Sequence, residues 1–242
     1  MRSAPAPSGP RRPPSTERTS LGTPLFVLNL KTYPASLGGG ALEIARDLAE
    51  AGRSAAVAVA IAPAAPDLAA VARLGLLPVL AQHVDPVEAG PTTGFLPVAA
   101  LVTEGLRGSL VNHSEHPISR DAIAAVTSRL GTAGLSAVVC ARDGKVAGAL
   151  AGLRPPYIAV EPPELIGGNR AVSTAKPEVI VESVGTVRAA SASTRLLCGA
   201  GIRGRADVRR ALELGAEGVL VASAVALAPK PRDAIVEMLS GL

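Results

Sequence analysis

The chain has 242 residues, 48% hydrophobic and 18% charged, which suits one large globular domain without a membrane span, since no apolar run approaches about 18 residues. Its formal net charge is +4, of which residues 1–22 contribute +3 and the remainder only +1. Because the remainder is nearly neutral and the chain has two tyrosines, two phenylalanines and no tryptophan, we expect no nucleic-acid binding.

The first 22 residues are rich in proline, serine and arginine and contain no apolar segment, so they predict a disordered tail rather than a secretory signal. The two cysteines, Cys140 and Cys198, have no metal-ligand spacing, and we expect free thiols in a reducing cytoplasm. Residues 23–242 are therefore predicted to form one domain, with no metal site and no cofactor.

Eight short apolar runs follow along the chain, at 25–30, 57–62, 77–82, 109–112, 137–140, 157–160, 195–198 and 218–221. They are almost continuously hydrophobic, as expected of parallel strands covered on both faces. The segments 41–50, 117–130, 178–190 and 205–214 carry apolar residues at helical spacing, and Ile235, Met238 and Leu239 give the last helix its apolar stripe. Eight strand–helix repeats in this length predict a single-domain (β/α)8 barrel.

Polar residues stand where several of these runs end, and in a barrel those ends converge on one rim. Asn29 and Lys31 end the first run, and their side chains should face the barrel mouth if Leu30 faces the helices. His113 follows the fourth run, and Ser114 and Pro117 favour a helix start just beyond it.

The sixth run ends in Glu161, which two prolines follow. Ile166 and Gly167 then form a loop with an apolar tip, which could close over a ligand and raise the proton affinity of Glu161 by excluding water. After the seventh and eighth runs come "CGAGIRG" and "ASAV", whose small residues leave backbone amides exposed where helices begin. Such amides can bind a phosphate group by donating hydrogen bonds to its oxygens.

Several stretches carry a resemblance to a known family, in that family's order: "NLKTYP", "AQHVDPVEAGPTTG", "NHSE", "AVEPPELIG", "STAKPEVI" and "CGAGI". Together they span roughly residues 25–225, and with them the chain resembles triosephosphate isomerase, in particular its shorter archaeal-type branch. The resemblance implies a barrel enzyme that interconverts dihydroxyacetone phosphate and glyceraldehyde 3-phosphate without a cofactor. It also implies a homo-oligomer, either a dimer or a tetramer.

The resemblance assigns roles to particular residues. Lys31 would supply positive charge to the developing enediolate, with Asn29 beside it. His113 would be a neutral electrophile at the carbonyl, and Glu161 would be the base. The remaining expected binding residues are the supporting carboxylate Glu115 and the lid and phosphate residues Ile166, Gly167, Gly201, Ala222 and Ser223.

Three alternatives remain open at this stage. The same base and electrophile could isomerise a related four-carbon sugar phosphate. A Schiff-base aldolase using Lys31 would need a neutral amine, which a nearby glutamate opposes. A barrel that binds phosphorylated metabolites without turnover would have little need of a base facing an electrophile.

Overall fold

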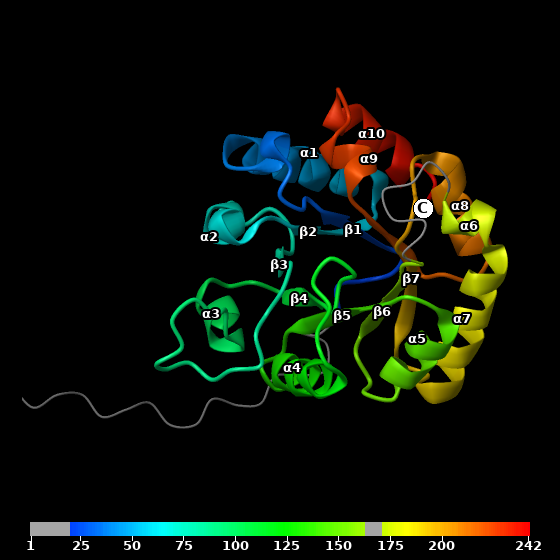
Figure 1. The fold of residues 1–242 in the computed structure, drawn as a ribbon. Helices are drawn as coiled ribbons and strands as arrows, with labels where there is room; N and C mark the ends of the chain where they lie inside the picture. The colour runs from blue at the N-terminus through cyan, green and yellow to red at the C-terminus, as the bar shows by residue number, and fades with distance from the viewer. Residues whose placement is uncertain (1–19, 163–170) are drawn as a thin grey trace, which may run out of the picture.

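The computed structural model describes residues 20–162 and 171–242, and over them the chain forms a (β/α)8 barrel in which helices ring a central parallel sheet (Figure 1). The strands are β1 (Leu25–Asn29), β2 (Ala58–Ala62), β3 (Leu80–Ala81), β4 (Gly108–Val111), β5 (Ser136–Ala141), β6 (Tyr157–Val160), β7 (Arg195–Cys198) and β8 (Gly218–Val221). The helices are α1 (Gly39–Ala55), α2 (Leu68–Ala72), α3 (Val98–Thr103), α4 (Arg120–Thr132), α5 (Gly144–Ala151), α6 (Val172–Ala175), α7 (Pro177–Ala190), α8 (Arg205–Glu213), α9 (Ser223–Ala226) and α10 (Pro231–Leu239). The predicted fold class is confirmed.

The sheet runs in the order β2-β1-β8-β7-β6-β5-β4-β3, with every neighbouring pair parallel. The two outermost strands meet through a parallel bridge between Ile61 and Val79, where the Ile61 amide donates to the Pro78 carbonyl at 3.0 Å. This contact closes the barrel. All eight strands therefore present their carboxyl ends at one rim.

Alternation along the strands sorts the apolar side chains into two cores. Val27, Leu110 and Leu220 belong to the cluster inside the barrel. Their neighbours Leu28, Val111 and Val221 belong to the larger cluster between the sheet and the helices. Because both faces of each strand are buried, the strands read as continuous apolar runs in the sequence.

Residues just before β1 close the end of the barrel at which the strands begin. The Tyr157 hydroxyl accepts a hydrogen bond from the Leu21 amide at 2.9 Å and donates to the Gly22 carbonyl at 3.0 Å. Leu21 is buried in the interior cluster. Residues 20–22, which the sequence places in the tail, thus pack against the barrel, whereas the tail over 1–19 lies outside the described residues and stays a prediction.

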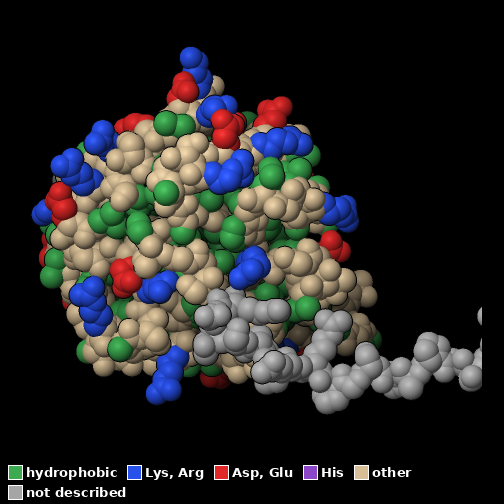
Figure 2. Space-filling view, turned by 180° about the vertical axis from the view of Figure 1, so that it is seen from behind, with side chains coloured by type: hydrophobic (Ala, Val, Ile, Leu, Met, Phe, Trp, Pro, Cys, Tyr) green, Lys and Arg blue, Asp and Glu red, His purple; other side chains and the backbone are tan. Residues whose placement is uncertain are grey.

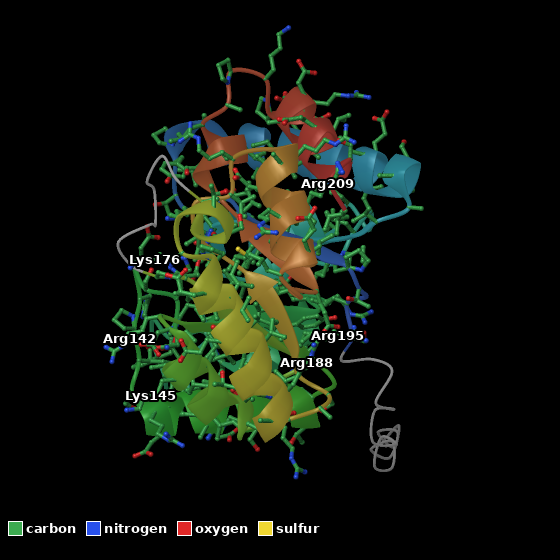
Figure 3. The ribbon with its side chains drawn as sticks, turned by 90° about the vertical axis from the view of Figure 1, so that its right-hand side faces the viewer. Arg142, Lys145, Lys176, Arg188, Arg195 and Arg209 are labelled. Atoms are coloured by element: carbon green, nitrogen blue, oxygen red, sulfur yellow. The ribbon has the colours of Figure 1, made fainter. Side chains whose placement is uncertain are left out.

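Charged side chains of both signs lie scattered over the face turned away from Figure 1 (Figure 2). On the side formed by α5, α7 and α8, the labelled lysines and arginines lie at separate places and form no single basic patch (Figure 3). Several have acidic neighbours, such as Arg142 with Asp143 at 3.2 Å and Arg209 with Glu213 at 3.7 Å. This pattern matches the near-neutral charge of the barrel. None of the helices in the described ranges is both long enough and apolar enough to cross a bilayer.

Candidate active site

A pocket opens at the carboxyl ends of the strands. It is lined by residues at or just beyond the ends of β1, β4, β6, β7 and β8, namely Asn29, Lys31, His113, Glu161, Gly199, Gly201, Ile202, Arg203, Leu220, Val221, Ala222 and Ser223. The structure thus brings together the three expected catalytic side chains and the expected phosphate residues, except Ile166 and Gly167, which lie outside the described residues. Glu115 lines a neighbouring cavity that shares Lys31 and His113.

Lys31 reaches the pocket from the loop after β1. Leu30 is fully buried in the outer core, so Asn29 and Lys31 face the pocket as the strand alternation predicts. The Lys31 ammonium forms an ion pair with Glu115, with Nζ 2.6 Å from Oε1. Its amide donates to the Asn29 side-chain oxygen at 2.9 Å. A mostly buried ammonium beside a carboxylate provides a fixed positive charge at the pocket wall.

His113 follows β4 and is 6% exposed. Nδ1 accepts a hydrogen bond from the Glu115 amide at 3.2 Å. That contact assigns the proton of a neutral ring to Nε2. Nε2 lies 3.5 Å from Glu161 Oε1, so its N–H points into the pocket between the two residues.

The predicted helix start directly after His113 is wrong. Residues 114–116 form a single turn closed by the His116 amide on the His113 carbonyl at 2.8 Å. The helix α4 begins only at Arg120, where the Ser119 hydroxyl accepts from the Ala122 amide. The His113 ring therefore accepts a hydrogen bond from a single backbone amide, that of Glu115, and does not face the N-terminal turn of a helix.

Glu161 follows β6 and is 4% exposed. Its backbone is held by the amide, which donates to the Ala141 carbonyl at 2.8 Å. Among the described residues its Oε2 atom has no hydrogen-bond partner. A buried carboxylate oxygen without a donor is costly, so its retention indicates a task at the pocket.

The pKa of His113 is set by its two carboxylate neighbours. Burial of the ring lowers this pKa, but the hydrogen bond and charge of Glu161, with the charge of Glu115, outweigh burial and the Lys31 charge and raise it above the ordinary 6.5. The Glu115 amide at Nδ1 opposes protonation, because an imidazolium could not accept that hydrogen bond. If Glu161 loses its negative charge, the main cause that raises the pKa is lost, and the neutral ring is favoured.

The two cysteines are free and buried. Burial raises the pKa of the Cys140 thiol well above its usual value, and the charge of Glu161 raises it further. Burial likewise raises the pKa of Cys198 to about 12. Both thiols therefore stay protonated at neutral pH and are poor nucleophiles.

Residues at the ends of β7 and β8 also line the pocket, and Gly201, Ala222 and Ser223 are the small ones among them. Gly201 has a φ of 70°, which glycine adopts without steric cost. Ala222 and Ser223 stand at the start of α9, where the first amides of a helix have no acceptor within it. Ala224 packs against the outer core and does not line the pocket. The backbone N–H groups at these positions can bind an anion by donating hydrogen bonds to it.

Three positioning contacts were not anticipated from the sequence. Gln82 binds the Lys31 carbonyl, and Asn112 ties the end of β4 to the Cys140 carbonyl and the Ile118 amide. A Cβ on Gly199 would lie 2.5 Å from Glu161 Cγ, so only glycine leaves room for that side chain. The motif "CGAGI" contains this signal, but its meaning requires knowing that Glu161 packs against it.

Within residues 20–162 and 171–242, no group of three or more His, Cys, Asp or Glu side chains could hold a metal ion.

The family model described as "Triosephosphate isomerase" matches residues 24–239. The chain belongs to the triosephosphate isomerase family. A relative named triosephosphate isomerase from Cenarchaeum symbiosum is 44% identical over 216 residues, which cover 89% of this chain and 96% of the relative. A protein of the same name from Methanothermus fervidus is 41% identical, and the match covers 90% of this chain and 98% of that relative. Another from Methanopyrus kandleri is 44% identical, and the match covers 92% of this chain and 99% of that relative.

These relatives span nearly the whole folded part, so the resemblance seen in the motifs is confirmed and the chain is an isomerase of the triosephosphate isomerase family. The alternative classes, an aldolase and a barrel that binds without turnover, are not favoured by these similarities.

The contact between Gly199 and Glu161 yields a first prediction. We expect Gly199→Ala to lower kcat by about 10- to 100-fold, because the added methyl group displaces the Glu161 carboxylate and small misplacements are costly. Steady-state kinetics measure this. Gly131→Ala in α4 is the matched control, since its Cβ would meet nothing within 4 Å. Equal kcat values for both variants would contradict the steric argument.

The charge environment of His113 yields a second prediction. We expect Glu161→Gln to lower the pKa of His113 below its wild-type value, because burial and Lys31 then act with less opposition. NMR titration of the imidazole measures the change. In the wild type, the raised pKa of His113 means that its protonation stabilises the fold below pH 6.5, and this stabilisation is lost as the pH rises through the folded-state pKa. The variant should lack this pH-dependent contribution to the free energy of unfolding. An unchanged His113 titration would show that Glu161 does not control the ring.

Proposed function

We propose that the chain interconverts dihydroxyacetone phosphate and D-glyceraldehyde 3-phosphate through an enediolate, with Glu161 as the base. The observation that carries the proposal is the convergence of a carboxylate, an imidazole and an ammonium on one pocket, which Gly201, Ala222 and Ser223 also line. Membership in the triosephosphate isomerase family supports the same substrate pair.

In the proposed mechanism Glu161 removes a proton from the carbon next to the carbonyl and returns it to the neighbouring carbon. The Glu161 side chain lines the pocket, and its Oε2 atom has no hydrogen-bond partner among the described residues, so no donor competes for that oxygen. Gly199 provides the space in which the carboxylate lies.

His113 and Lys31 stabilise the oxygen that gains negative charge. The Nε2–H group of a neutral His113 donates to that oxygen, and the Lys31 ammonium and Asn29 amide lie on the same pocket wall. When Glu161 accepts the substrate proton its charge disappears, so the main influence that would protonate His113 is absent as the enediolate forms.

The phosphate group is held by the amides of Gly201, Ala222 and Ser223; Gly167, which the family resemblance assigns to the same group, lies outside the described residues. Fixed N–H donors bind the phosphate alike in the substrate and in the enediolate. They orient the reacting carbons between Glu161 and His113 and leave the proton transfer to those side chains.

Glu161→Asp provides a third prediction. It withdraws the carboxylate by one methylene group, and we expect kcat to fall about 100-fold while inhibition by inorganic phosphate stays within about twofold. The assay uses purified protein, glyceraldehyde 3-phosphate and a chelator in place of added metal. Glu178→Asp, on the exposed first turn of α7, is the matched control. An unchanged rate in Glu161→Asp would refute the role given to Glu161.

Three further measurements separate the remaining alternatives. A higher kcat/KM for a four-carbon ketose phosphate would reassign the substrate. Trapping of a covalent adduct by borohydride would indicate a Schiff base at Lys31, which requires loss of the ion pair with Glu115. Phosphate binding without turnover would leave only the binding function.

The proposal extends to a homo-oligomer, either a dimer or a tetramer. A second cavity adjoins Lys31 and Glu115, and Phe95 at its edge is 53% exposed. An exposed aromatic ring beside a cavity is typical of a surface covered by another subunit. As a fourth prediction, sedimentation equilibrium should give at least twice the chain mass of 24.2 kDa, and Phe95→Asp should lower it. A monomeric wild type would contradict the assignment.

The cytoplasm is the proposed location. Two free, buried cysteines support it, because unpaired thiols persist in a reducing compartment.

A further inference from the structure

Gln82 lies directly after β3, touches the backbone of the lysine-bearing loop and supplies no reacting group. Its Nε2 atom donates to the carbonyl oxygens of Lys31 at 2.9 Å and Ala62 at 3.0 Å. Since both partners are acceptors, they define which end of the amide carries nitrogen. One half-buried side chain thus joins the ends of β1, β2 and β3.

The backbone of Lys31 needs such support. Its φ is 50°, in the left-handed region that is sterically unfavourable for a residue with a side chain. The conformation is held at both ends of the residue: the amide donates to Asn29 Oδ1 and the carbonyl accepts from Gln82. If the backbone relaxed to a negative φ, the Lys31 side chain would leave the direction in which Nζ meets Glu115.

Two other hydrogen bonds shape the backbone of this loop from within it, whereas the Leu30 amide donates to the Ala62 carbonyl of β2 at 3.0 Å. Asn29 is two residues away, and the Ser36 hydroxyl, which donates to the Leu30 carbonyl at 2.9 Å, belongs to the same loop. Gln82 is 51 residues away in sequence and sits on a different strand end. It therefore ties the Lys31 carbonyl itself to the barrel, whereas the Leu30 amide ties only the preceding residue and the Asn29 and Ser36 contacts lie within the loop.

We propose that Gln82 is a positioning residue, which holds Lys31 in its left-handed conformation and so places the ammonium against the developing negative charge. The inference rests on the proposed role of Lys31.

The test compares two ligands in binding calorimetry. Phosphoglycolate carries a carboxylate where the enediolate develops and needs the ammonium, whereas inorganic phosphate needs only the backbone amides. We expect Gln82→Met, which keeps the length but removes both donors, to weaken phosphoglycolate binding about 10-fold, leave phosphate binding within about twofold, and lower kcat about 10- to 100-fold. In the Lys31→Ala background, Gln82→Met should change phosphoglycolate binding by less than about twofold, because the effect acts through Lys31.

Thr194→Val is the matched control. The Thr194 hydroxyl is buried and donates to the Pro155 carbonyl at 2.8 Å near the start of β7, so its loss costs a buried donor far from the rim. It should lower the unfolding midpoint and leave both ligands unchanged. If Gln82→Met does not fold, Gln82→Asn keeps the amide with shorter reach and should show the same selective loss.

The outcomes separate this inference from the proposed function. Equal affinities of the wild type for phosphoglycolate and phosphate would sink the proposed role of Lys31 itself. If Lys31→Ala weakens phosphoglycolate binding but Gln82→Met does not, or if Gln82→Met is equally harmful without Lys31, the positioning role is overturned.

Discussion

Closure of eight parallel strands is the constraint on which the rest of this molecule depends. It forces residues from β1, β4, β6, β7 and β8 onto one rim, although Asn29 and Ser223 stand at nearly opposite ends of the chain. The two buried cores hold the strands at fixed spacing, so the groups at the rim are placed by the framework and not by one another. Because the framework fixes their positions, charged and polar side chains can lie close together in this pocket even where burial or like charge makes their proximity unfavourable.

The electrostatics of the pocket follow from that placement. His113 and Glu161 are both nearly buried with 3.5 Å between Nε2 and Oε1, and burial and charge pull the pKa of His113 in opposite directions. The balance depends on the charge of Glu161, which in the proposed reaction changes when a proton is transferred. The base and the hydrogen-bond donor are thereby coupled, and the neutral donor is favoured at the moment when negative charge appears on the substrate oxygen.

Much of the fold could be predicted because strands buried on both faces leave continuous apolar runs. The runs at 157–160, 195–198 and 218–221 match β6, β7 and β8 residue by residue, whereas β3 keeps only Leu80 and Ala81 of the run at 77–82. The start of α4 was missed because Ser114 and Pro117 suit a turn as well as a helix. Lys31, His113 and Glu161 could be found from strand ends and family motifs, but the contacts of Gln82 and Gly199 depend on partners 51 and 38 residues away, which local patterns do not reveal.

The central claim is that a carboxylate moves a proton between adjacent carbons of a triose phosphate. Its most direct test is mass spectrometry of glyceraldehyde 3-phosphate formed from dihydroxyacetone phosphate in D2O. The account predicts solvent deuterium on the carbon next to the carbonyl, since a proton held by Glu161 can exchange with water, and no such labelled product from Glu161→Gln. Conversion without any deuterium on carbon would indicate direct hydride transfer and contradict the account.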